Sequence, residues 1–183
     1  MNETIKTLLT RRSVRAYEDK AVPRELVEKI LECGKYACTG GGSQPWHFTI
    51  VTNREWMKKV SALNKEIYLN SPVERLRIKA QNPEYSDFYN APMAIFVSGN
   101  SPRSLADCAC ATQNMAVAAA SLGLGSCFIA SFKSCLESEE GKKLFDELPS
   151  PEGYAPQFAL SLGYPKGDAP TAAPRKENIV AEF

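Results

Sequence analysis

The sequence Arg11-Arg12-Ser13-Val14-Arg15 places three guanidinium groups and a hydroxyl within five residues, near the start of a chain of 183 residues. Arginine stays charged at any working pH, and its planar fork of donors matches phosphate and carbonyl oxygens. Taken alone, a basic run of this kind is more often a solvated surface than a binding site. The rest of the chain decides between these two interpretations.

The composition is that of an ordinary globular protein, with 44% hydrophobic and 23% charged residues. The formal net charge of +1 does not suggest nucleic acid or an anionic membrane as a partner. No apolar run approaches the roughly 20 residues that a bilayer-spanning helix needs. Residues 1–6 lack the apolar core of a signal peptide. We therefore expect one cytoplasmic domain, 1–183, with neither nucleic acid nor a membrane as its partner.

The six cysteines and the single histidine, His47, do not form a recognisable metal-binding pattern. Cys108 and Cys110 are the only close pair, and on a helix positions i and i+2 point to nearly opposite sides. We therefore expect no metal site, a structural role for His47, and cysteines that act as small buried hydrophobic residues. Cys38 also fits a redox-sensitive thiol.

The periodicity of apolar residues predicts a layered fold in which helix exceeds strand. Helices are expected at 5–9, 24–37, 55–79 with a break at 70–72, 107–122 and 142–148. Strands are expected at 48–52, 94–98 and 158–163, with an extended segment that begins at 127–129. The helix at 107–122 is apolar on most of its circumference, so it should lie at the centre of the fold. Residues 81–90 should form an irregular loop, in which Phe88 and Tyr89 fit either a substrate channel or loop packing.

The glycine run Gly40-Gly41-Gly42 is followed by Ser43-Gln44-Pro45-Trp46. It is not a phosphate-binding P-loop, because the Gly-Lys-Ser/Thr sequence and a helix start are both absent. Gly123-Leu124-Gly125 lacks the third glycine of a dinucleotide fingerprint and follows a helix instead of a strand. Together with Arg11–Arg15 and Arg175, however, the glycine run could hold a ligand that has both a phosphate and a planar ring.

Four motifs in this order give the chain a resemblance to the nitroreductase family: Arg11-Arg12-Ser13-Val14-Arg15-Ala16-Tyr17, Ser43-Gln44-Pro45-Trp46-His47-Phe48, Leu122-Gly123-Leu124-Gly125-Ser126-Cys127, and Leu162-Gly163-Tyr164-Pro165 with Pro174-Arg175-Lys176. The resemblance covers nearly the whole chain. It implies an α+β fold with a central mixed, mostly antiparallel sheet flanked by helices. It also implies an intertwined homodimer with two FMN sites at the interface.

The resemblance assigns one part of the flavin site to the first motif and another to the glycine loop of the partner subunit. Arg11 and Ser13 would face the phosphate and ribityl chain, with Arg12 nearby. Arg15 would face the N1/O2 edge. The loop Cys38-Thr39-Gly40-Gly41-Gly42 would lie against the flavin, with Gln44 supporting it.

The remaining flavin contacts implied by the resemblance lie later in the chain. Asn64, with Asn70 as the alternative, is the candidate for the pyrimidine edge. Backbone groups of Ala130 and Ser131 would reach N5 and O4, and Arg175 with Lys176 would close on the phosphate.

The glycine loop departs from the family pattern Pro-Ser-x-x-Asn-x-Gln-Pro. Cys38 stands at the Pro position and Gly42 at the Asn position. One hydrogen bond on the flavin side is therefore expected to be absent.

The implied activity is that of an FMN-dependent oxidoreductase that uses NADH or NADPH to reduce nitroaromatics, quinones or related electron-poor acceptors. Hydride would pass through flavin N5 in a ping-pong sequence, Arg15 would stabilise developing charge, and no side chain would act as a general acid or base. Three alternatives stay open: a specialised member that dehalogenates or consumes flavin, a non-catalytic flavin sensor, and a nucleotide-phosphate binding module without flavin.

Overall fold

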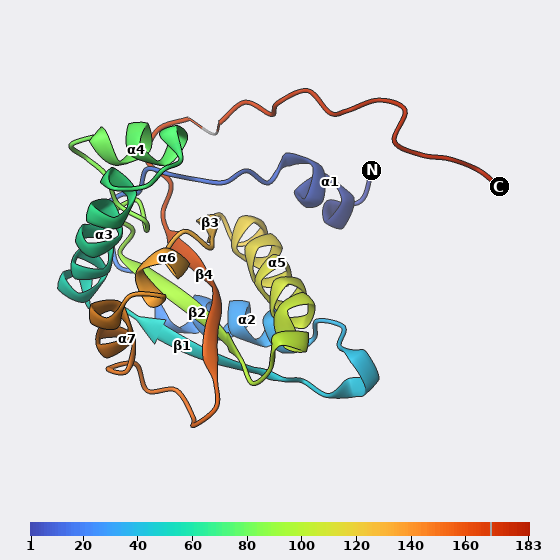
Figure 1. Cartoon of the computed structure of the whole chain (residues 1–183). Helices are drawn as coiled ribbons and strands as arrows, with labels where there is room; N and C mark the ends of the chain where they lie inside the picture. The colour runs from blue at the N-terminus through green and yellow to red at the C-terminus, as the bar shows by residue number, and fades with distance from the viewer. Residues whose placement is uncertain (169) are drawn as a thin grey trace.

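A four-stranded sheet lies at the centre of the computed structural model, which describes residues 1–168 and 170–183 (Figure 1). In the order β1-β2-β4-β3, the strands are Trp46–Val51, Met93–Gly99, Ala155–Gly163 and Gly125–Ile129. All the ladders between them are antiparallel. The parallel pairing recorded in the described part is one isolated bridge, Ser13 to Ser126. The predicted central, mostly antiparallel sheet is confirmed.

The second strand, β2, is buried on both sides of the sheet. Every residue of β2 is buried. Ile95 and Val97 belong to one hydrophobic cluster, while Ala94 and Phe96 belong to the other. Since side chains alternate across a strand, the sheet must be covered by helices on both faces.

Helices cover both faces and exceed the strands, as predicted (Figure 1). One face packs on α2, Arg24–Lys35, and α5, Leu105–Ser121. The other packs on α3, Arg54–Leu69, together with α6, Lys133–Leu136, and α7, Glu139–Phe145. The shorter elements are α1, α4, η1 and η2, at Glu3–Thr10, Glu74–Gln81, Gly40–Gly42 and Pro102–Ser104. The described residues contain no helix with the length and apolar character that crossing a membrane requires.

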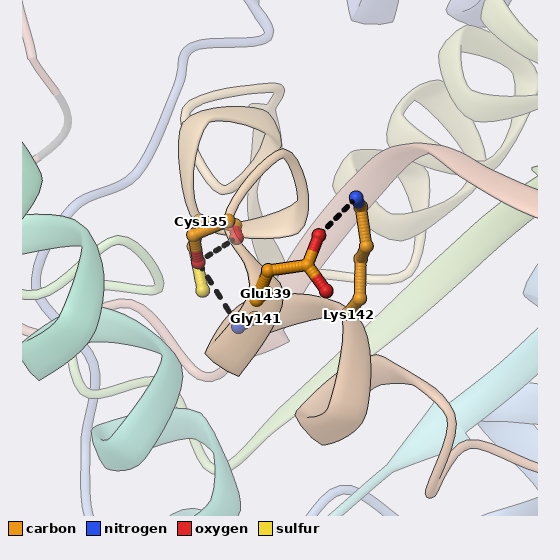
Figure 2. A network of polar contacts seen from close by, with 5 residues as sticks. Cys135, Glu139, Gly141 and Lys142 are labelled. Carbon is orange, nitrogen blue, oxygen red and sulfur yellow. Dashed lines mark hydrogen bonds and ion pairs between the residues drawn. The ribbon is translucent and has the colours of Figure 1, made fainter.

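The helix predicted at 142–148 begins and ends three residues earlier, as α7. Its N-terminus is set by Ser138, whose hydroxyl accepts from the Gly141 backbone N–H at 3.0 Å and donates to the Cys135 carbonyl at 2.8 Å. A side chain at Gly141 would collide with that carbonyl. Figure 2 shows this turn, together with the ion pair between Glu139 and Lys142. Capping of this kind fixes a helix start that apolar spacing alone does not locate.

Both ends of the chain carry large apolar side chains that are mostly exposed. The α1 residues Ile5, Leu8 and Leu9 are 47%, 51% and 61% exposed. The segment 171–183 is extended and exposed, and it runs away from the body of the molecule past α1 (Figure 1). The apolar residues of α1 are therefore only partly covered within one chain.

Candidate functional site

A cavity of about 480 Å³ lies at the C-terminal end of α5, and the arginine-rich segment forms part of its wall. Arg11, Arg12 and Arg15 line it, together with residues of α1, the turn 123–125 and the segment that follows β4. Its volume lies within the range of small-molecule sites. Among the described residues, none of the three guanidinium groups forms an ion pair. Glu3, Asp168 and Lys166 also line the cavity, so its basic side chains outnumber its acidic ones and favour an anionic ligand.

The arginine-rich segment is held against the sheet by backbone pairing. The Val14 N–H donates to the Ser126 carbonyl at 2.9 Å, and Tyr17 forms an isolated bridge to Pro165. A Cβ atom at Gly125 would lie only 2.8 Å from the Val14 side chain. The glycine at this position therefore allows the segment 11–15 to approach β3 closely.

The three arginines differ in what holds them. Nη1 of Arg12 donates to the carbonyls of Leu9 and Arg11, each at 2.8 Å, and so caps the end of α1. Nε of Arg15 donates to the Tyr89 hydroxyl at 3.3 Å. No side-chain hydrogen bond from Arg11 to the described residues is recorded. The predicted roles of Arg11 and Arg15 fit this arrangement, whereas Arg12 has a structural role already.

A buried polar cluster joins Asn64 to the turn at Ala130 and Ser131. Asn64 is fully buried, and its Nδ2 lies 3.0 Å from the Ser131 carbonyl and 3.0 Å from each carboxylate oxygen of Asp87. Oδ1 of Asn64 is also buried and has no hydrogen-bond partner. The structure therefore brings Asn64 and Ser131 together, as the predicted site requires. Asn70 lies at the exposed end of α3, where it donates to the Glu66 carbonyl.

Tyr85 and Asp87 also belong to this cluster, although neither was predicted from the sequence. The Tyr85 hydroxyl donates to Asp87 at 2.9 Å, and the Ser131 hydroxyl also donates to Asp87. Burial raises the pKa of the Asp87 carboxyl, and hydrogen bonds from Ser131, Tyr85 and Asn64 oppose that shift. A tyrosine and an aspartate in an irregular loop follow no sequence pattern. The sequence therefore does not indicate that they are hydrogen-bonded to each other in a buried cluster.

The Tyr89 backbone is held in an unusual conformation. Tyr89 and Asn90 have φ angles of 54° and 53°, in the left-handed region that bulky residues rarely adopt. Such strain clusters at functional sites. Here it presents the Tyr89 side chain to Arg15, so the segment 85–90 contacts both the arginine segment and the cluster around Ser131.

The glycine loop lies near the opposite end of α5 in the same chain (Figure 1). The Gly40 N–H donates to Asp107 Oδ1 at 3.3 Å, whereas Ala120 lines the arginine cavity. At 1.5 Å per residue, these two helix positions are about 20 Å apart. The structure thus places the predicted site residues Cys38, Thr39, Gly40, Gly42 and Gln44 away from Arg11–Arg15 of their own chain.

The loop conformation itself requires glycine at two positions. Gly41 and Gly42 have φ angles of 62° and 70°, and Gln44 also has a positive φ of 45°. A Cβ atom at Gly40, Gly41 or Gly42 would meet no atom within 4 Å. An open strip of backbone is what close approach to a flat ring requires.

The remaining predictions have mixed outcomes. Arg175 and Lys176 are exposed and lie in the segment 171–183, for which no contact with the predicted site is recorded. The expectation that all six cysteines are buried is wrong for Cys33 and Cys38, which are exposed, and for Cys110, which is half-buried. His47 Nε2 lies 3.2 Å from the Pro149 carbonyl. Within the described ranges, no group of three His, Cys, Asp or Glu residues could hold a metal ion.

Comparisons with known proteins agree with the fold and with the order of the motifs. The model of the Nitroreductase family matches residues 8–164. A protein of Archaeoglobus fulgidus, provisionally named NADH dehydrogenase/NAD(P)H nitroreductase, is 33% identical over 168 residues, which cover 92% of this chain and 88% of the relative.

Two solved structures are similar over the full length of both chains. A nitroreductase with bound FMN from Bacteroides fragilis has a TM-score of 0.89 at 32% identity. A nitroreductase with bound FMN from Desulfitobacterium hafniense has the same TM-score at 26% identity. With the family match over most of the chain, these similarities show that the protein belongs to the nitroreductase family.

Proposed function

We propose that this protein is an FMN-dependent oxidoreductase that uses NADH or NADPH to reduce electron-poor acceptors such as nitroaromatics or quinones. The observation that carries the proposal is the cavity at the end of α5, with three arginines in its wall that form no ion pair with a described residue. FMN bound in the similar nitroreductases of Bacteroides fragilis and Desulfitobacterium hafniense supports the choice of ligand.

The residues present fit FMN. Arg11 and Ser13 would hold the phosphate and the ribityl chain, since Arg11 has no recorded side-chain partner in the described part of the chain. Asn64 Oδ1, buried without a partner, offers an acceptor for a ring N–H. No hydrogen bond from the backbone N–H of Ala130 or Ser131 to a described residue is recorded, so both can donate to the ring.

In the proposed reaction, the protein mainly positions the flavin and places charge beside it. When bound, FMN supplies hydride acceptance and hydride donation at N5. Arg15 would place a fixed positive charge beside the N1/O2 edge, where reduction develops negative charge. Its orientation is supported by Tyr89, whose hydroxyl and ring both contact the guanidinium. The proposed reaction thus needs no side-chain acid or base.

A homodimer is part of the proposal. The glycine loop is bonded at one end of α5 and the arginine cavity lies at the other, so a loop that reaches the cavity must belong to a second copy. The exposed apolar residues of α1 and the extended tail fit packing on that copy. Surfaces of this kind are typical of interfaces between subunits.

An absorbance spectrum of the purified protein, followed by NADH or NADPH addition without oxygen, tests the proposal. Flavin bands that bleach would support it and identify the preferred donor. Bands that persist with both donors would favour a flavin-binding sensor or a member with another electron source. If no bands form even after incubation with FMN, the proposal fails. The oligomeric state, measured by light scattering, tests the homodimer separately.

A further inference from the structure

Asp87 is a buried carboxyl group to which neither the proposed reaction nor the predicted flavin contacts assign a role. Its residue is only 1% exposed, and none of the recorded ion pairs in the described part of the chain involves it. Burying a carboxylate without a cationic partner is costly unless hydrogen bonds compensate. A carboxyl group with a shifted pKa in such a place is a candidate for a functional role.

The hydrogen bonds of Asp87 lead to the predicted flavin contacts. Asn64 Nδ2 donates to both carboxylate oxygens at 3.0 Å, and the Ser131 hydroxyl donates to Oδ1. The Tyr85 hydroxyl donates to the same oxygen at 2.9 Å. Asp87 is thus one hydrogen bond away from two predicted flavin contacts, Asn64 and the turn at Ala130 and Ser131.

The backbone also ties Asp87 and the turn in place. The Asp87 N–H donates to the hydroxyl of Ser61 on α3 at 3.0 Å. The Ser131 carbonyl accepts from the Tyr68 hydroxyl at 3.2 Å as well as from Asn64. Hydrogen bonds made in a buried, low-dielectric setting are strengthened, so the orientation of the turn depends on its contact with Asp87.

We propose that Asp87 is the positioning residue of the N5/O4 side of the flavin site. Its hydrogen bonds hold Ser131 and Asn64 in place relative to each other, and its carboxylate places a negative charge behind the flavin ring, one hydrogen bond beyond these two residues. This inference depends on the proposed function, because it assumes that FMN binds at this edge. A carboxylate behind the ring opposes the gain of negative charge on reduction. Asp87 therefore keeps the reduction potential of the bound cofactor lower than it would be with a neutral residue in its place.

The groups around Asp87 favour this charged state at mildly alkaline pH. The side chains that contact it, those of Asn64, Tyr85 and Ser131, all donate hydrogen bonds to it. The charged or titratable groups that face it are Tyr85 from its own segment, Lys79 from α4 and Cys135 from α6. Burial raises the pKa of the Tyr85 hydroxyl and of the Cys135 thiol, so both favour their neutral forms. The positive charge of Lys79 lowers the pKa of Asp87 and so favours the carboxylate.

The test compares FMN dissociation constants and cofactor reduction potentials at pH 8 for the FMN-loaded protein and its variants. Asp87→Asn should weaken FMN binding about tenfold and shift the potential upward. Ser131→Ala removes one hydrogen bond but keeps the charge, so it should weaken binding without an upward shift. Glu84→Gln is the matched control, since it removes an exposed carboxylate from the same loop and should change neither quantity.

Unchanged affinity and potential in Asp87→Asn would overturn the inference, as would an equal upward shift in Glu84→Gln. If Asp87→Asn does not fold, Ser131→Ala decides, because unchanged affinity in that variant removes the positioning role. These outcomes are distinct from failure of the proposed function, in which the unmodified protein itself would bind no FMN.

Discussion

The Tyr89 hydroxyl lies 3.3 Å from Nε of Arg15, and the guanidinium lies 5.6 Å from the centre of the Tyr89 ring. This contact spans 74 positions of sequence and joins the arginine-rich segment to the loop before β2. It restricts the position of the Arg15 charge, which lines the cavity. A cation–π contact combined with a hydrogen bond restricts a guanidinium more than either alone.

Arg15→Ala is expected to lower the reduction potential of the bound cofactor and to slow its reduction by NAD(P)H. The physical reason is the loss of a fixed positive charge where negative charge develops. Arg15→Lys keeps the charge but loses the planar fork, so its potential should lie between the two. Spectroelectrochemical titration gives the potentials, and stopped-flow absorbance gives the rates. An unchanged potential in Arg15→Ala would remove its assigned role.

Gly125→Ala should destabilise the protein by about 1–3 kcal/mol, the usual cost of overpacking. The new Cβ would lie within 2.9 Å of three Val14 atoms, and Val14 is pinned by its backbone bond to Ser126. Gly40→Ala is the control, because a Cβ there meets nothing within 4 Å. Urea unfolding of both apo variants measures the difference. Equal stability of the two variants would show that the segment 11–15 does not pack on β3 in this way.

The sequence predicted the strands and long helices because their apolar residues follow regular spacing. In β2, Ile95, Phe96 and Val97 are all buried, and a continuous run of that kind is visible without a structure. The α5 helix was predicted for the same reason, although its first turn at Leu105 was not. Helix ends depend on capping contacts such as that of Ser138, which apolar spacing does not reveal.

The candidate site was predictable only in part. Asn64 was predicted from family resemblance, but its partner Asp87 lies 23 residues away in a loop without periodicity. Buried polar networks have no repeat in sequence, so only the folded chain reveals them. The glycine loop was predicted as well, yet its distance from Arg11–Arg15 follows from the length of α5. No pattern in a single sequence encodes which copy of a chain supplies a loop.

Mild oxidation is expected to link Cys38 and Cys110. The pKa of the Cys110 thiol is raised, chiefly by its hydrogen-bonding contact with the Cys38 thiol. The Gly40–Asp107 hydrogen bond holds the same loop on the same helix, and Asp107 and Cys110 share one helix face. A peroxide would remove two hydrogens from the pair and form a disulfide and water. Non-reducing peptide mass spectrometry measures the link.

Cys110→Ala is the control for this cross-link, since Cys38 should then have no thiol partner on α5. Cys33 offers a comparison within the same chain, because it is exposed like Cys38. A link between Cys33 and Cys38 in place of the expected one would contradict the geometry of the loop. A disulfide at the predicted position would fix the glycine loop on α5 and restrict how it meets a flavin.

Arg175→Ala should weaken FMN binding by about tenfold, which corresponds to the loss of one charge-assisted hydrogen bond. Riboflavin lacks the phosphate, so its affinity should not change. The Arg175 side chain lies in the exposed tail. Its contact with the phosphate therefore requires the tail to pack against the site when the complete site assembles. Fluorescence titration with both ligands measures the two affinities. Equal weakening for both would show that Arg175 acts on the fold of the tail and does not contact the phosphate.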